Sequence, residues 1–234
     1  HWDDAFTDLS SALAVAQAGD SIWVALGIYT PPTNLGRTAC FLFPSGVRLF
    51  GGFAGVETSL EERDWQKFKT QLSGDLGFPN DTTDNAYNIL FMERPALGTI
   101  VDGCYFTGGR ANAAHPGLPT TDRLRCGGAI YILGEGGVAY PDIRNCTFED
   151  NSAERFGGAV FAYNNYNGSI APRFLNCTFR NNRAHLGAGI YRFGGSVLER
   201  SPDFGDCIFE KGVSSGGGGG LYFDTSSSGV VVNA

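Results

Sequence analysis

The sequence has little charge and no long apolar run, and these two deficits exclude several classes of protein. Charged residues make up 18% of the 234 residues, and 17 basic and 24 acidic side chains give a formal net charge of −7. Such a surface repels phosphate backbones and anionic lipids, so we expect no nucleic-acid partner. No segment approaches the about 20 apolar residues of a membrane helix, so we expect no membrane insertion.

Two motifs that would indicate specific chemistry are also missing. The six cysteines include no Cys-x-x-Cys pair, which argues against a zinc site. The run Gly216–Gly220 is not followed by Lys-Ser or Lys-Thr, so it does not form a phosphate-binding loop. We therefore predict no metal and no cofactor.

The first element that the sequence predicts is a short amphipathic helix within residues 1–20. Asp3 or Asp4 can cap it, and Gly19 can end it. Apolar side chains recur at helical spacing at Phe6, Leu9, Leu13 and Ala16. Such a helix can cover the open end of a stack of strands.

Residues 21–99 are predicted to form irregular first coils of that stack. The expected strands, including one that runs into the next region, are Ser21–Ala25, Gly46–Phe53, Ile89–Met92 and Thr99–Phe106. The segments Thr30–Arg37 and Leu60–Asp84 are expected to be loops that leave the stack.

Residues 100–234 repeat a unit of about thirty residues. The unit is marked by cysteines spaced 42, 31 and 30 residues apart, and an insertion at Ala111–Arg125 explains the longest step. A phenylalanine follows two residues after each cysteine, so the markers are Cys104, Cys146, Cys177, Cys207, Phe106, Phe148, Phe179 and Phe209. A second motif reads Gly-Gly-Ala-Ile at Gly127 and Gly-Gly-Ala-Val at Gly157, and a variant begins at Gly187.

A period of this length without an internal helix is typical of a β-solenoid. Successive coils pair as parallel strands about 4.8 Å apart, which stacks equivalent residues into ladders. Asn and Gly tolerate the left-handed angles that sharp corners need. The predicted corner residues are Asn145, Asn176, Asn151, Asn182, Gly127, Gly157 and Gly187. We therefore expect one all-β domain over residues 1–234.

The repeat resembles those of bacterial polymorphic outer membrane proteins. The likeness rests on Gly127–Ile130 and Gly157–Val160 combined with the Phe-x-x-Asn spacing of Phe148 to Asn151 and of Phe179 to Asn182. More broadly, the chain resembles secreted bacterial right-handed parallel β-helix proteins. The resemblance implies a right-handed fold and an extracellular or cell-surface location. Phe209 departs from the pattern, because Gly212 replaces the asparagine three residues later.

The cysteines have two readings. An even number in a secreted chain favours disulfides. However, Cys104, Cys146, Cys177 and Cys207 occupy one repeat position, which predicts a buried ladder of small apolar side chains. Cys40 and Cys126 lie outside this ladder and could pair with each other.

The leading functional hypothesis is a structural protein that associates head to tail with itself. A β-helix exposes unpaired strand edges at its ends. The segment Val230, Val231 and Val232 is β-prone and uncharged, so it could pair with the next subunit, and Trp2 and Phe6 lie at the opposite end. Such a contact generates an open filament.

Two alternatives remain. In an adhesin, the loops Thr30–Arg37, Leu60–Asp84 and Ala111–Arg125 would bind a glycan or a cell surface. A polysaccharide lyase or hydrolase would need clustered carboxylates and a base, but no carboxylate recurs in adjacent coils. We therefore assign the charged residues that could belong to such a catalytic cluster to solvated strand faces. These residues are Asp102, Asp142, Glu149, Asp150, Glu154, Arg155, Arg173, Arg180 and Arg183. We predict no catalytic residue and no enzymatic activity.

Overall fold

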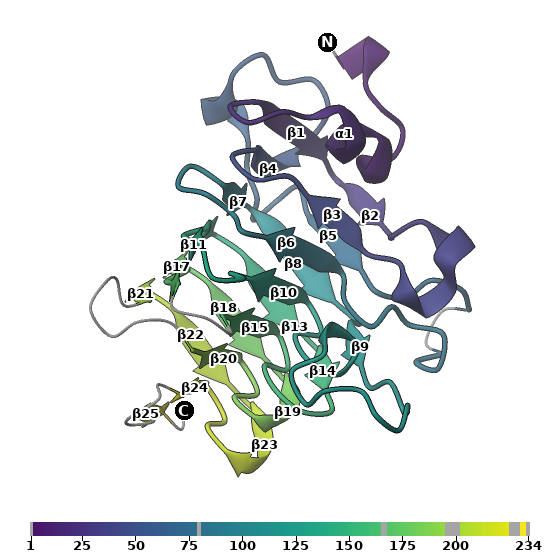
Figure 1. Ribbon diagram of the computed structural model, residues 1–234. Coiled ribbons are helices and arrows are strands. Elements are labelled where there is room, and N and C mark those ends of the chain that lie inside the picture. Colours follow the sequence, from purple (N-terminus) through teal and green to yellow (C-terminus); the bar gives the residue numbers. More distant parts are fainter. Residues whose placement is uncertain (1, 79–80, 165–167, 195–201, 225–229, 233–234) are drawn as a thin grey trace.

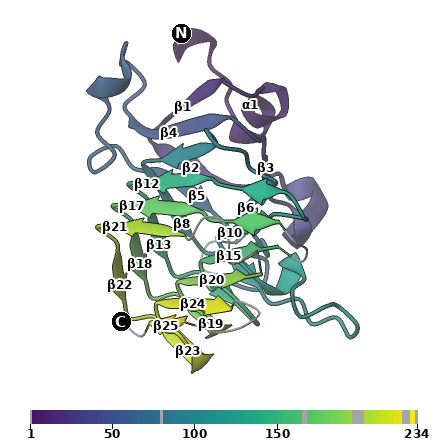
Figure 2. The same ribbon diagram turned by 60° about the vertical axis from the view of Figure 1, so that its left-hand side comes forward.

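The chain folds into a stack of parallel coils. The structure is a computed structural model that describes residues 2–78, 81–164, 168–194, 202–224 and 230–232. Figure 1 shows the N-terminal segment at one end of the stack and the last strands at the other, and Figure 2 shows the strands of successive coils lying above one another.

Each coil contributes one strand to each of three long sheets, called sheets A, B and C here. Sheet A consists, in spatial order, of β1 (Ser21–Ala25), β4 (Arg48–Phe53), β7 (Ile100–Asp102), β12 (Asp142–Arg144), β17 (Arg173–Leu175) and β21 (Asp203–Gly205). Sheet B consists of β2 (Gly27–Tyr29), β5 (Thr70–Ser73), β8 (Cys104–Thr107), β13 (Thr147–Glu149), β18 (Thr178–Arg180) and β22 (Ile208–Glu210). Sheet C consists of β3 (Phe41–Phe43), β6 (Leu90–Glu93), β10 (Ile130–Leu133), β15 (Val160–Tyr163), β20 (Ile190–Phe193), β24 (Leu221–Asp224) and β25 (Val230–Val232).

Shorter elements complete the coils. A fourth sheet contains β9 (Arg110–Ala111), β14 (Ser152–Ala153), β19 (Arg183–Leu186) and β23 (Val213–Gly217), and β11 (Val138–Ala139) pairs with β16 (Ser169–Ile170). The helical elements are η1 (Trp2–Asp4), α1 (Leu9–Val15), η2 (Thr33–Thr38), η3 (Leu60–Glu62) and η4 (Arg123–Arg125).

The predicted ladders form the interior. Phe148 pairs in register with Phe106 on one side and with Phe179 on the other, and the ring centroids lie 5.0 and 4.7 Å apart. Phe209 continues the stack beyond Phe179 at 4.7 Å. The neighbouring cysteine ladder is confirmed, because Cys104, Cys146 and Cys177 are at most 2% exposed and Cys207 is half-buried. Side chains of equal size therefore repeat over the regular coils, and Leu72 takes the place of the phenylalanine on the rung before Phe106.

The corners between sheets use left-handed residues. Asn145 and Asn176 have φ angles of 50° and 51°, and Gly127, Gly157 and Gly187 lie between 62° and 66°. A Cβ on Gly157 would lie 2.1 Å from the Val160 carbonyl oxygen, so glycine is also required by space.

Asn151 and Asn182 have a different role from the predicted left-handed corner. The left-handed residues there are the preceding ones, Asp150 and Asn181, with φ angles of 56° and 55°. The side chains of Asn151 and Asn182 point inward and are 1% exposed. The Asn151 amide donates to the Phe106 carbonyl at 3.1 Å, and the Asn182 amide donates to the Phe148 carbonyl at 2.9 Å. They form a buried amide ladder that holds adjacent coils together.

The N-terminal helix exists but begins later than predicted. Asp8 caps α1 by accepting from the Ser11 N–H at 2.8 Å, so the prediction of Asp3 or Asp4 as cap is wrong. Asp3 and Asp4 instead belong to the separate turn η1. Leu9 and Leu13 enter the core, whereas Phe6 precedes the helix and is 59% exposed.

The prediction that Leu60–Asp84 is a loop leaving the stack is wrong for its middle part. The strand β5 lies within it as a full rung of sheet B, and Leu72 is completely buried. Trp65 packs directly over Gly52, where a Cβ would lie 2.6 Å from the Trp65 Cα. The charged residues at the start of this segment favoured a solvent-exposed loop, but the side chain of Arg63 packs against Asp102 at 2.9 Å.

The phenylalanine ladder gives a direct test of the core. Replacing Phe148 by alanine removes a fully buried ring that stacks on two others, so we expect a loss of about 3–5 kcal/mol in the free energy of unfolding. Phe78 is 78% exposed, and its replacement by alanine should change that free energy by less than about 0.5 kcal/mol. Urea unfolding followed by circular dichroism measures both. Equal losses in the two variants would contradict the stacked core.

Candidate functional site: the open ends of the stack

The N-terminal end of the stack presents two unpaired strand edges. In the described part of the chain, β1 ends sheet A and β2 ends sheet B, and each pairs with one neighbour only. A groove of about 1110 Å³ lies between β1 and the segment that contains η1 and α1. The backbone of an incoming strand therefore has both space and an edge at this end.

The rim of this groove is apolar and exposed. Phe6, Val15 and Val56 all line it, and Val56 is 78% exposed. Leu26 and Ile28 extend the exposed apolar surface toward β2. Large apolar side chains gathered at one end of a molecule are typical of an interaction surface.

One wall of the groove is held rigidly. The rings of Trp23 and Phe53 stack at 4.8 Å, and Trp2 packs on Phe53 at 5.5 Å. The Trp2 indole N–H donates to the Glu57 carbonyl at 2.9 Å. The Glu57 carboxylate in turn accepts from three successive backbone N–H groups, including that of Ala54 at 2.6 Å. The wall is thus formed before any partner arrives, which lowers the entropic cost of binding.

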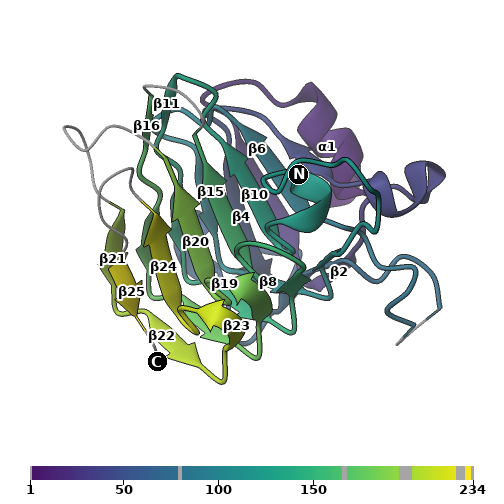
Figure 3. The same ribbon diagram turned by 60° about the horizontal axis from the view of Figure 1, so that its bottom comes forward.

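The C-terminal end also has open edges, visible on the near side in Figure 3. Within the described residues, β21 and β22 each pair with one neighbour, and Ile208 on β22 is 56% exposed. Among the described residues, sheets A and B therefore end in unpaired parallel edges at both ends.

The segment Val230–Val232 occupies a place that the sequence did not indicate. It forms β25, which pairs antiparallel with β24 of its own chain, with Val232 opposite Leu221 and Val230 opposite Phe223. In this structure the strand therefore covers the end of sheet C. At the other end of sheet C, α1 packs beside β3. Sheet C is closed at both ends, whereas in the part of the chain that the structure describes sheets A and B are open.

The outer faces carry ion pairs that are mutually satisfied. Asp142 contacts Arg144 in its own coil and Arg173 in the next coil, the latter at 2.6 Å. Burial of Asp142 opposes its ionisation, but the bonds from both arginines outweigh it and lower the pKa of Asp142. Arg180 bridges Glu149 and Glu210 at 3.3 Å each.

The prediction that Asp102 belongs to a solvated face is wrong. Asp102 is 4% exposed and is buried against Arg63. The remaining charged candidates lie on the outside of the coils. Glu154 contacts Arg125 at 2.6 Å and Arg155 at 3.5 Å. In the part of the chain that the structure describes, no group of three or more His, Cys, Asp or Glu residues is placed to hold a metal.

A small polar furrow of about 260 Å³ runs along the outer face of sheet B. Trp65 and Lys69 stand at one side, and Thr147 and Thr178 lie on successive rungs of its floor. Tyr105 donates to Glu149, and its burial together with this bond raises its pKa. The Lys69 ammonium lies 3.1 Å from the centroid of the Tyr105 ring. These contacts fix Tyr105, Glu149 and Lys69 to one another.

The two cysteines outside the ladder are free thiols in the structure. The thiol of Cys40 faces the Arg123 guanidinium at 3.8 Å, and the thiol of Cys126 donates to the Thr120 carbonyl at 3.2 Å. Among the described helices, none is long and apolar enough to span a membrane.

Thiol alkylation tests this arrangement. Burial raises the pKa of Cys126 to about 12, so at pH 8 its thiol is protonated and inert in the native chain. Unfolding returns the pKa to about 8.5 and makes the thiol reactive. We expect iodoacetamide at pH 8 to modify half-buried Cys40 first and Cys126 only in denaturant, as read by peptide mass spectrometry. If both cysteines resist modification even in denaturant until a reductant is added, they form a disulfide instead.

The comparisons with known proteins agree with the fold of stacked parallel coils. A family model described as a right handed beta helix region matches residues 71–234, which is more than half of the chain and includes the whole regular repeat. No curated protein and no solved structure matches the chain. The right-handed parallel fold predicted from the repeat is therefore confirmed.

Proposed function

Starting from a chain that belongs to the right-handed β-helix family, we propose that it associates end to end with further copies of itself. The observation that carries the proposal is that, among the described residues, sheets A and B end in unpaired parallel edges at opposite ends of the stack. The occupant of the N-terminal groove is the last coil of a second copy. The resulting assembly is a structural element at the cell surface, the location that the resemblance of the repeat implies.

The strand directions make this contact geometrically natural. All strand pairs within sheets A and B are parallel, so β21 and β22 of one copy can continue onto β1 and β2 of the next with the same direction and the same sheet order. The contact joins two different surfaces, so it does not close on itself and generates a filament. Each junction replaces bonds to water by backbone bonds between strands and removes the apolar rim from water.

Charge limits how tightly the ends can join. The N-terminal end carries Asp3, Asp4, Asp8 and Asp20, and the C-terminal end carries Asp203 and Asp206 together with Lys211 and with Glu210, which is paired with Arg180. Like charges across a junction repel, and dissolved salt screens them over about 10 Å at 0.1 M. The contact therefore depends on its apolar and backbone components.

The apolar rim provides one test. Phe6 is 59% exposed, so Phe6→Glu costs the monomer little, but it prevents burial of the ring at the junction. Because burying such a side chain is worth about 1.5–3 kcal/mol, we expect the association constant to fall about tenfold or more. Leu97 is 71% exposed in a turn of a central coil, and Leu97→Glu adds the same charge away from the groove. Sedimentation velocity and negative-stain electron microscopy measure both variants. Monomers at every concentration in the unchanged chain would refute the proposal.

The terminal strand provides an independent test. Ending the chain at Asp224 removes β25 and exposes the parallel edge of β24, so a third sheet becomes available at the C-terminal end. We expect the shortened chain to associate more strongly than the full chain at equal concentration in light scattering. Loss of association, with an unchanged circular dichroism spectrum, would instead show that Val230–Val232 is itself the segment that joins neighbouring copies.

A further inference from the structure

We propose that the neck of the loop between β5 and β6 binds a calcium ion through Asp84, Asn85 and Asp75. This site is independent of the association proposed above. It lies outside the regular repeat, on the connection that leaves sheet B after Ser73.

The two arms of this loop are held side by side. The Ala86 N–H donates to the Gly74 carbonyl at 2.7 Å and closes the neck. One step farther out, the Phe78 N–H donates to Asp84 Oδ2 at 3.0 Å. A Cβ on Gly77 would lie 2.4 Å from the same oxygen, so the two arms are in contact there as well. Asp75 on the outgoing arm therefore faces Asn85 and Asp84 on the returning arm.

Asn85 is the observation that points to a ligand. Its side chain is buried, with 4% of the residue exposed, and its Nδ2 donates to the Gly108 carbonyl at 2.5 Å. This bond fixes the orientation of the amide, because the reversed amide would place two carbonyl oxygens together. The Oδ1 atom is then left without a hydrogen-bond partner among the described residues. A buried unpaired acceptor costs about 1–3 kcal/mol, so a partner is expected.

The amino end of the Asn85 amide lies beside the outgoing arm of the neck. A Cβ on Gly108 would lie 3.2 Å from the Asn85 Nδ2 and 3.6 Å from the Asp75 N, so the amide and the backbone of Asp75 are neighbours. Oδ1 of Asp84, the adjacent residue, is also buried and has no partner among the described residues. The neck thus places two aspartates beside one buried amide oxygen that lacks a hydrogen-bond partner among the described residues.

The carboxylate and amide oxygens of the neck determine which kind of ion it can bind. Carboxylate and amide oxygens in an irregular arrangement suit Ca²⁺, which accepts six to eight oxygen ligands, including water, in flexible geometry. Arg37, which lies beside the neck, is already engaged. Its Nε donates to the Asn85 backbone carbonyl at 2.6 Å, and its guanidinium lies over the Tyr87 ring. With only two carboxylates and a nearby guanidinium, the dissociation constant should lie at about 10⁻⁴–10⁻³ M.

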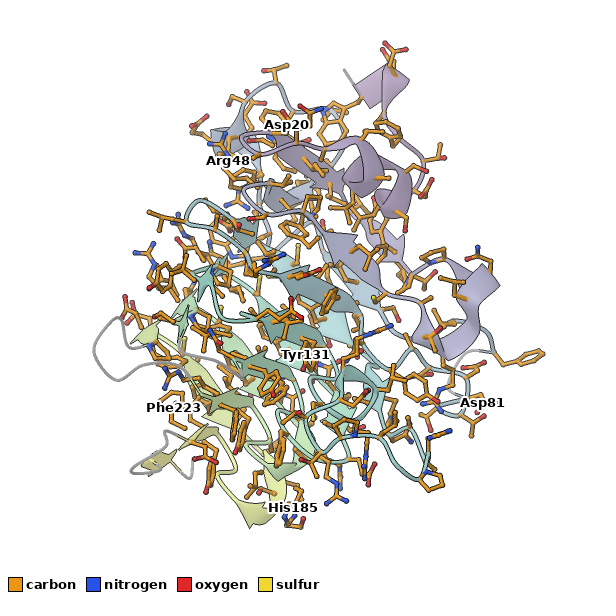
Figure 4. The ribbon with its side chains drawn as sticks, viewed as in Figure 1. Asp20, Arg48, Asp81, Tyr131, His185 and Phe223 are labelled. Carbon is orange, nitrogen blue, oxygen red and sulfur yellow. The ribbon has the colours of Figure 1, made fainter. Side chains whose placement is uncertain are left out.

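A matched pair of substitutions tests the site. Asp84→Asn keeps an oxygen for the Phe78 N–H but removes one ligand charge, so we expect the calcium dissociation constant to rise about tenfold or more. Asp81 lies in the same loop at the edge of the molecule (Figure 4), and its carboxylate is used by the N–H and hydroxyl of Thr83 at 2.9 and 2.6 Å. Asp81→Asn makes the same charge change and should leave the dissociation constant within about twofold.

Isothermal titration of the EDTA-treated full chain with CaCl₂ measures the dissociation constants, and thermal unfolding with and without calcium follows the same site. Calcium should raise the midpoint of the unchanged chain and of Asp81→Asn, and it should raise that of Asp84→Asn much less. Equal weakening by both substitutions would show general attraction to an acidic loop and would overturn the proposal. Absence of binding at millimolar calcium would also overturn it.

Discussion

Parallel backbone pairing between coils is the constraint on which the rest of this molecule depends. Each coil is a single turn of chain, and its strands acquire partners only from the coils above and below. The interior can therefore be dry and continuous, but the first and last coils each retain one unsatisfied side. In sheet C these sides are covered by α1 and β25. In sheets A and B no described element covers them, and the same pairing that builds the fold leaves these edges unpaired.

Register follows from this pairing and explains the side-chain ladders. Because each strand pairs in register with its equivalents, a residue type that fits one rung must also fit beside itself. Flat rings do so by stacking, as Phe148 does, and amides do so by donating in one direction, as Asn151 and Asn182 do. Charges fit only in alternation, which is why Arg180 stands between Glu149 and Glu210. The residue types found in the repeat are therefore those whose side chains can be placed beside their equivalents in the adjacent coils.

The sequence was sufficient for most positions that recur, although the recurring Asn151 and Asn182 were predicted as corner residues and instead point inward. Cys146, Phe148 and Asn145 have counterparts about thirty residues away, so their burial or corner role is indicated several times over. Segments outside the repeat have no counterpart elsewhere in the chain that could support a prediction. The cap at Asp8, the rung β5 and the burial of Arg63 against Asp102 each depend on contacts distant in sequence, and residue type alone favoured other assignments. The fold-back of β25 and the unpaired oxygen of Asn85 are visible only once the coils are assembled.

The direction of the hydrogen bonds has a mechanical consequence. The bonds between coils point along the axis of the stack, so a pull along that axis loads successive coil boundaries in series rather than sharing the load among them. Such a column should yield one boundary at a time, beginning at the least reinforced one, and lengthen by the contour of each released coil. The inter-coil amide bonds of Asn151 and Asn182 and the stacked rings act across these same boundaries. They make the central coils the part of the column that should open last.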